Sequence, residues 1–188
     1  MSEPEIRVDM VELEEEVTEE DHILGPEEPA ITLVEYADYQ CEACIASFKG
    51  VEQLMETHGD HVRLVFRPFP LVSYHDMAMP GATAAEAAGN QGTFWEMHRK
   101  IFSAEGEFDD DDLTRWGEEL GLDMERYEAD RHDEDVELHV RHVRLRGART
   151  GVNGTPTFFL GGLRIEPDPT YESIAAHVDY FLEDAEEE

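Results

Sequence analysis

Residues 33–44, LVEYADYQCEAC, contain both cysteines of this 188-residue chain, Cys41 and Cys44. The stretch AITLVEYAD (30–38), which leads into them, is rich in β-branched and aromatic residues, as is typical of a buried strand. From Cys41 onward the apolar residues recur at helical spacing, so a helix is expected to begin there. A cysteine pair at this junction can be a redox pair, half of a metal site or a structural disulfide.

The position of Cys41 at a helix start favours redox chemistry. A thiol there faces unpaired backbone N–H groups and the positive end of the helix dipole, which both favour the thiolate. Because the thiolate is the nucleophile in thiol–disulfide exchange, we expect Cys41 to attack and Cys44, one turn further on, to resolve.

Two other interpretations of the cysteine pair remain open. A structural zinc site needs four ligands, and Cys41 and Cys44 supply two. His139 and His142 could share one helix face, but arginines stand beside them in ELHVRHVRLR, and we expect no metal. A structural disulfide closing so short a loop would remove little entropy from the unfolded chain.

The remaining segments predict an α/β fold. HVRLVFRPF (61–69) indicates a second strand, which completes a β-α-β unit, and residues 80–151 are helical in pattern. Two short strands follow, joined by Gly161-Gly162, which is a strong hairpin signal, and a last helix closes the chain. The order β-α-β, helical insertion, β-β-α predicts a mixed central sheet with helices packed on it.

The charge balance is extreme, with 46 Asp plus Glu against 14 Lys plus Arg and a formal net charge of -32. Such a surface repels nucleic acid and anionic membranes, and no run reaches the roughly 18 apolar residues of a membrane helix. The acid-rich segments outside the N-terminus remain amphipathic, as in proteins that fold in molar salt. We therefore expect an origin in a halophilic archaeon.

We expect residues 1–24 to form a disordered acidic tail and residues 25–188 to form the folded domain. The first ten residues, MSEPEIRVDM, lack the basic and apolar regions of an export signal, so we expect a cytoplasmic protein.

A second motif, GVNGTPTFF (151–159), places Thr155-Pro156 directly before a strand. A proline at a strand start marks an edge or a special turn, and we expect the Thr155–Pro156 bond to be cis. Together with VFRPFPL (65–71) and AAEAAGNQGTFWEMHRKIF (84–102), these motifs resemble the DsbA-like branch of the thioredoxin superfamily.

The resemblance implies a thioredoxin-like fold and a thiol–disulfide oxidoreductase with Cys41 as nucleophile and Cys44 as resolving cysteine. It implies that Thr155 and Pro156 form a loop against the disulfide and the substrate backbone. No cofactor is implied. The partners would be protein or small-molecule disulfides or dithiols and an unidentified electron donor or acceptor.

Glu42 and Ala43 depart from the resemblance, since many relatives carry proline after the first cysteine. The Glu42 carboxylate competes with the thiolate for the positive helix end, which favours a reducing poise. A redox-inert binding or chaperone module is the alternative from another functional class. We assign no catalytic role to His75 or His98, which we interpret as packed or partly exposed histidines.

Overall fold

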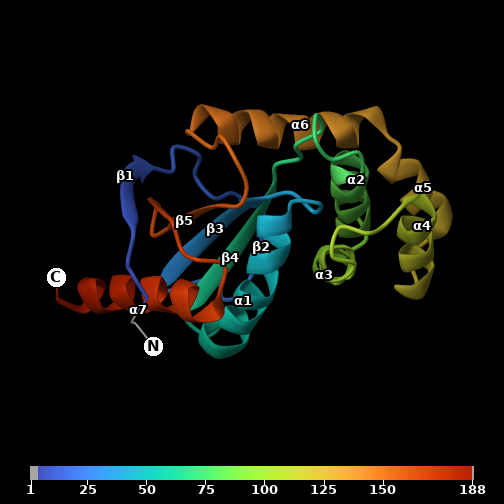
Figure 1. Cartoon of the computed structure of the whole chain (residues 1–188). Helices are drawn as coiled ribbons and strands as arrows, with labels where there is room; N and C mark the ends of the chain where they lie inside the picture. The colour runs from blue at the N-terminus through green and yellow to red at the C-terminus, as the bar shows by residue number, and fades with distance from the viewer. Residues whose placement is uncertain (1–3, 188) are drawn as a thin grey trace.

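The computed structural model describes residues 4–187, which form a six-stranded sheet with seven helices around it (Figure 1). The strand order across the sheet is β1-β6-β5-β3-β4-β2. The strands are β1 (Val8–Glu12), β2 (His22–Leu24), β3 (Ile31–Ala37), β4 (Val62–Pro68), β5 (Thr157–Leu160) and β6 (Leu163–Ile165). The helices are α1 (Glu42–His58), α2 (Ala78–Gly89), α3 (Phe94–Ser103), α4 (Asp110–Glu119), α5 (Met124–Arg131), α6 (Glu134–Arg149) and α7 (Tyr171–Glu187).

The predicted mixed sheet is confirmed. Strands β3 and β4 pair in parallel, and every other pairing in the sheet is antiparallel. The parallel pair needs a crossover, which α1 supplies. The hairpin between β5 and β6 turns at Gly161 and Gly162, whose φ angles of 58° and 87° suit glycine.

Helices α1 and α7 cover one face of the sheet and lie side by side in Figure 1. Side chains from both helices meet the alternate residues of the strands in one apolar cluster, since successive strand residues point to opposite faces. The fully buried members of this cluster include Leu33, Leu54, Val62, Leu160, Ile174 and Val178.

Helix α6 and the segment after β1 cover the other face, where Val34, Tyr36 and Phe159 form a second apolar cluster. Gly147 of α6 makes this packing possible. A Cβ atom at Gly147 would lie 2.6 Å from Cε1 of Tyr36, closer than two carbon atoms can approach. The helix therefore rests directly on the tyrosine ring.

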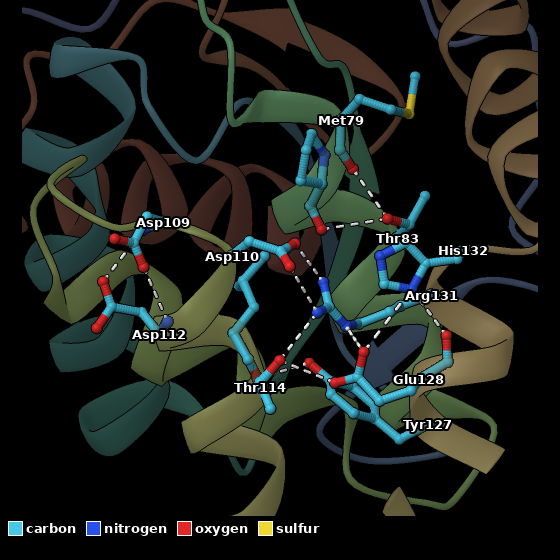
Figure 2. A network of polar contacts seen from close by, with 12 residues as sticks. Met79, Thr83, Asp109, Asp110, Asp112, Thr114, Tyr127, Glu128, Arg131 and His132 are labelled. Carbon is cyan, nitrogen blue, oxygen red and sulfur yellow. Dashed lines mark hydrogen bonds and ion pairs between the residues drawn. The ribbon is translucent and has the colours of Figure 1, made fainter. Parts of the chain in front are cut away.

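The five helices α2–α6 follow β4 and precede β5 along the chain, in the stretch where the sequence predicts helices. Helices α4 and α5 are joined by the buried Arg131 side chain, drawn in Figure 2. Its guanidinium donates to both oxygens of Asp110, to Thr114 and to Glu128. All three acceptors belong to the inserted helices, so the insertion has its own polar framework, while its apolar side chains share one cluster with Ala37, Cys44 and Phe66.

The prediction of a disordered tail is wrong for the described part of residues 1–24, and residues 1–3 lie outside the described range. Strand β1 pairs with β6, and β2 pairs with β4. Arg67 holds the segment between them, because its guanidinium donates to both oxygens of Asp21 and to the carbonyl groups of Glu15 and Glu16. These pairings join residues far apart in sequence, so local composition did not reveal them.

Candidate active site

The cysteine pair lies where β3 gives way to α1. Cys41 is the N-cap of α1, with extended φ and ψ angles of -70° and 120°. Its N–H donates to the carbonyl of Asp38, and its carbonyl accepts from Ile45 N–H in the first helical hydrogen bond. The Cys41 side chain therefore stands at the open end of the helix, as predicted.

The structure brings Thr155 and Pro156 beside Cys41. The Cys41 Sγ atom donates to the Thr155 carbonyl oxygen at 3.3 Å. Strand β5 pairs with β3 so that Thr157 lies opposite Tyr36, which sets the preceding loop against the end of β3. The Thr155–Pro156 bond is cis, which confirms that prediction.

The two cysteines have opposite acid–base character. A hydrogen bond from Cys44 lowers the pKa of Cys41 to about 5; burial opposes this effect, while Thr155 and the N–H groups of Cys44 and Ala43 reinforce it. Burial is the main cause that raises the pKa of Cys44 well above its usual value. Both cysteines are free thiols, Cys41 half-buried and Cys44 fully buried.

The Thr155 hydroxyl is a further donor at this site. Its Oγ1 atom is buried and has no hydrogen-bond partner among the described residues. Thr155 lowers the pKa of both cysteines, which makes its unpartnered hydroxyl a candidate donor to a thiolate. The sequence motif indicated Thr155 but not this role.

Glu35 is a functional candidate that the sequence analysis missed. It is buried in β3 on the face that also carries Leu33 and Ala37, and Ala37 shares an apolar cluster with Cys44. Burial, and secondarily the nearby Glu52 carboxylate, raises the pKa of Glu35 to about 8. The available signal was a carboxylic acid in an otherwise apolar strand six residues before Cys41. A carboxyl with this pKa can exchange a proton near neutral pH.

Grooves flank the cysteine pair on two sides. One is lined by Ala43, Ser47, Pro156 and Phe158, and it follows the loop predicted to meet substrate. The other contains Gln40, Glu42 and Ile45, the residues around Cys41, together with Tyr74 and His75. Sequence neighbours of Cys41 therefore line both grooves, Ala43 in the first and Gln40 and Glu42 in the second.

Within residues 4–187, no three His, Cys, Asp or Glu side chains gather as a metal site. In the same range, no helix combines the length and apolar character needed to span a bilayer. His98 is buried and donates to or accepts from the Tyr39 hydroxyl at 3.0 Å, consistent with a packed histidine.

A cysteine pair at a helix start beside a cis-proline loop, on a mixed sheet of this order, defines a thioredoxin-like protein. The protein-family model for thioredoxin matches residues 17–180, so the chain belongs to the thioredoxin family.

The solved structures agree with this assignment. A thioredoxin-like oxidoreductase from Silicibacter pomeroyi DSS-3 is 27% identical, with a TM-score of 0.75 over 87% of this chain and 92% of that one. The α-DsbA1 protein of Wolbachia pipientis, at 16% identity, shares the fold, with a TM-score of 0.75 over 90% of this chain and 94% of its own.

The curated relatives carry a different name. A Na(+)/H(+) antiporter NhaA 1 of Salinispora arenicola is 37% identical over 158 residues, which are 84% of this chain and 24% of the antiporter. The NhaA antiporter of Herminiimonas arsenicoxydans is 37% identical over 145 residues, 77% of this chain and 23% of its own length. The chain thus spans about a quarter of these relatives, which are bacterial proteins.

Proposed function

We propose that the chain is a thiol–disulfide oxidoreductase that exchanges disulfides through Cys41 and Cys44. The Cys41 thiolate attacks a client disulfide and forms a Cys41–client disulfide, while the other client sulfur leaves and takes up a proton. Cys44 then loses its proton and attacks the Cys41 sulfur, which releases the second client thiol and forms the Cys41–Cys44 disulfide. The client gains two electrons and two protons, and the dithiol supplies the electrons.

The observation that carries this proposal is the contrast between the two sulfurs. The pKa of Cys41 is lowered to about 5 at a half-buried helix start, whereas the pKa of the buried Cys44 is raised. A low-pKa, accessible cysteine next to a buried one is the arrangement of an attacking and a resolving thiol. A redox-inert binding module has no need for this contrast.

The clients that fit this site are proteins or small molecules with a disulfide or dithiol. The names of the structural neighbours, a thioredoxin-like oxidoreductase and a DsbA protein, support this class of partner. A second dithiol or disulfide of unknown identity would return the pair to its starting state. Ion transport belongs to the whole antiporters, of which this chain spans a quarter.

The source organism, the salt concentration and the cellular location of the reaction stay predictions. The net charge of -32 supports a halophilic source and activity in molar salt. A cytoplasmic location and an archaeal origin rest on the sequence interpretation alone.

Trapping of clients in molar KCl tests the proposal. The Cys44→Ser variant should accumulate mixed disulfides with reduced-and-reoxidised insulin, because Cys41 still attacks and nothing resolves the product. The Cys41→Ser variant should trap none, and only the wild-type chain should turn over. Equal trapping by the two variants, or trapping by neither, would contradict the assigned roles.

A further inference from the structure

The groove between the start of α1 and residues 74–76 and 105–107 has a volume of about 530 Å³. Gln40 and Glu42, which flank Cys41 in sequence, form part of its wall, so the groove opens next to the helix start that carries the nucleophile. An in-line attack sends the leaving sulfur of a client away from Cys41. The Thr155 carbonyl occupies one side of the Cys41 sulfur, and we infer that the leaving sulfur departs on the groove side.

His75 lines the groove, and a contact with Asp38 fixes the orientation of its ring. Its Nδ1 atom lies 2.9 Å from Oδ2 of Asp38, a carboxylate that is buried. Asp38 also accepts from the N–H groups of Gln40 at 2.8 Å and Leu71 at 2.7 Å. A carboxylate with these donors only accepts, so Nδ1 carries the hydrogen of the His75–Asp38 bond.

This bond leaves Nε2 as the ring atom that can gain or lose a proton. Nε2 of His75 has no protein partner within residues 4–187, and the side chain is 25% exposed. A histidine whose Nδ1–H is fixed by a carboxylate presents Nε2 in a defined orientation, as in other acid–base sites. The groove is the open space that His75 lines.

The charge of the groove creates a need for a proton donor. Its walls carry the carboxylates of Glu42, Asp76, Glu105 and Glu107, and of these only Glu105 has a cationic partner, Lys49 at 3.3 Å, in the described chain. A client thiolate leaving among these carboxylates meets like charge at short range, where salt screens least. Protonation of the leaving sulfur removes that repulsion.

We propose that His75, oriented by Asp38, is the acid–base residue for the client sulfur. This inference rests on the proposed thiol–disulfide exchange. When Cys41 attacks, the client S–S bond breaks, and the leaving sulfur takes the electron pair of that bond and a proton from Nε2 of the charged imidazole. Solvent returns the proton to His75. In client oxidation the neutral imidazole removes the proton of the client thiol before it attacks the Cys41–Cys44 disulfide.

Two neutral disulfides distinguish proton donation by His75 from a purely structural role of this residue. The 2-thiopyridine leaving group of 2,2′-dipyridyl disulfide needs no proton from the protein, whereas the alkyl thiol of bis(2-hydroxyethyl) disulfide does. In His75→Asn the side-chain amide retains an N–H for Asp38 but cannot titrate. We expect this variant, in molar KCl, to lose about 100-fold in rate with the alkyl disulfide and to keep its rate with the dipyridyl disulfide. His132→Asn, at an exposed histidine away from the groove, should leave both rates unchanged.

If His75→Asn reacts as fast as the wild type with both disulfides, or loses rate equally with both, the role of His75 is overturned and the proposed function stays intact. A wild-type chain that reacts with neither disulfide would instead overturn the proposed function. A second measurement uses the wild-type chain alone, so it does not depend on the folding of a variant. With alkyl disulfides of rising leaving-thiol pKa, donation by His75 predicts a weak dependence of the rate, and a steep dependence would contradict it.

Discussion

The sulfur of Cys41 lies 3.3 Å from the carbonyl oxygen of Thr155, although 114 positions of sequence separate the two residues. The antiparallel pairing of β5 with β3 creates this contact, because it sets the start of β5 against the end of β3. Cys41 therefore receives its environment from two elements, the helix that it caps and the loop before β5.

Replacing Thr155 by valine should raise the pKa of Cys41 above its value of about 5. Thr155 lowers this pKa, and its buried hydroxyl has no hydrogen-bond partner in the described residues. Titration of the thiolate by its ultraviolet absorbance would measure the change. Thr155→Ser retains the hydroxyl and should keep the wild-type pKa; a serine variant that behaves like the valine variant would show that the hydroxyl is not the cause.

The reduction potential should fall between those of thioredoxin and DsbA. The pKa of Cys41, about 5, lies between the values of about 7 for thioredoxin and about 3.5 for DsbA. We expect a potential between about -270 and -150 mV, measured against glutathione in molar salt. Glu42→Ala should make it less negative, since the competing carboxylate in the first turn of α1 is removed. An unchanged potential in this variant would exclude Glu42 as a determinant.

Stability should fall as the pH rises from about 4.5 to 8 because of Glu35. Its pKa is raised to about 8 in the folded chain from an ordinary value of 4.5, so the folded state binds the extra proton between these values. Its contribution is fully present below pH 4.5 and lost as the pH passes 8, on the order of a few kcal/mol. In thermal unfolding, the advantage of Glu35→Gln over the wild type should grow across this range. Glu134→Gln, at an exposed position, should show no such trend.

Folding should depend on salt. At a net charge of -32, self-repulsion destabilises the compact chain, and molar salt screens it over about 3 Å. Calorimetry after dialysis from molar KCl to dilute buffer should show a lower melting temperature or loss of the transition. A variant with exposed Asp111, Glu134 and Glu172 changed to amides should depend less on salt. Equal melting temperatures at both salt concentrations would remove the halophilic interpretation.

Gly147→Ala should destabilise the fold by about 1–3 kcal/mol, because the new methyl group overlaps the Tyr36 ring and forces α6 from the sheet. Gly154→Ala is the matched control, since a Cβ at Gly154 meets no atom within 4 Å. Chemical denaturation of both variants would compare them. Equal stability would show that α6 does not rest on Tyr36.

The sequence by itself determined the elements whose signals are local. The β-branched run before Cys41 and the helical spacing after it predicted β3 and α1 and placed Cys41 at the helix start. Gly161-Gly162 likewise predicted the hairpin, because a two-residue turn with positive φ favours glycine. These predictions needed only the periodicity of a few neighbouring residues.

Tertiary structure decided the remainder. The acidic N-terminal segment looked disordered, yet β1 and β2 gain their partners from β6 and β4 and their anchor from Arg67. The raised pKa of Glu35 and the held ring of His75 also depend on neighbours that only folding supplies. Burial and hydrogen bonding between distant residues set the free energies of these groups, and the order of amino acids along the chain does not display either one.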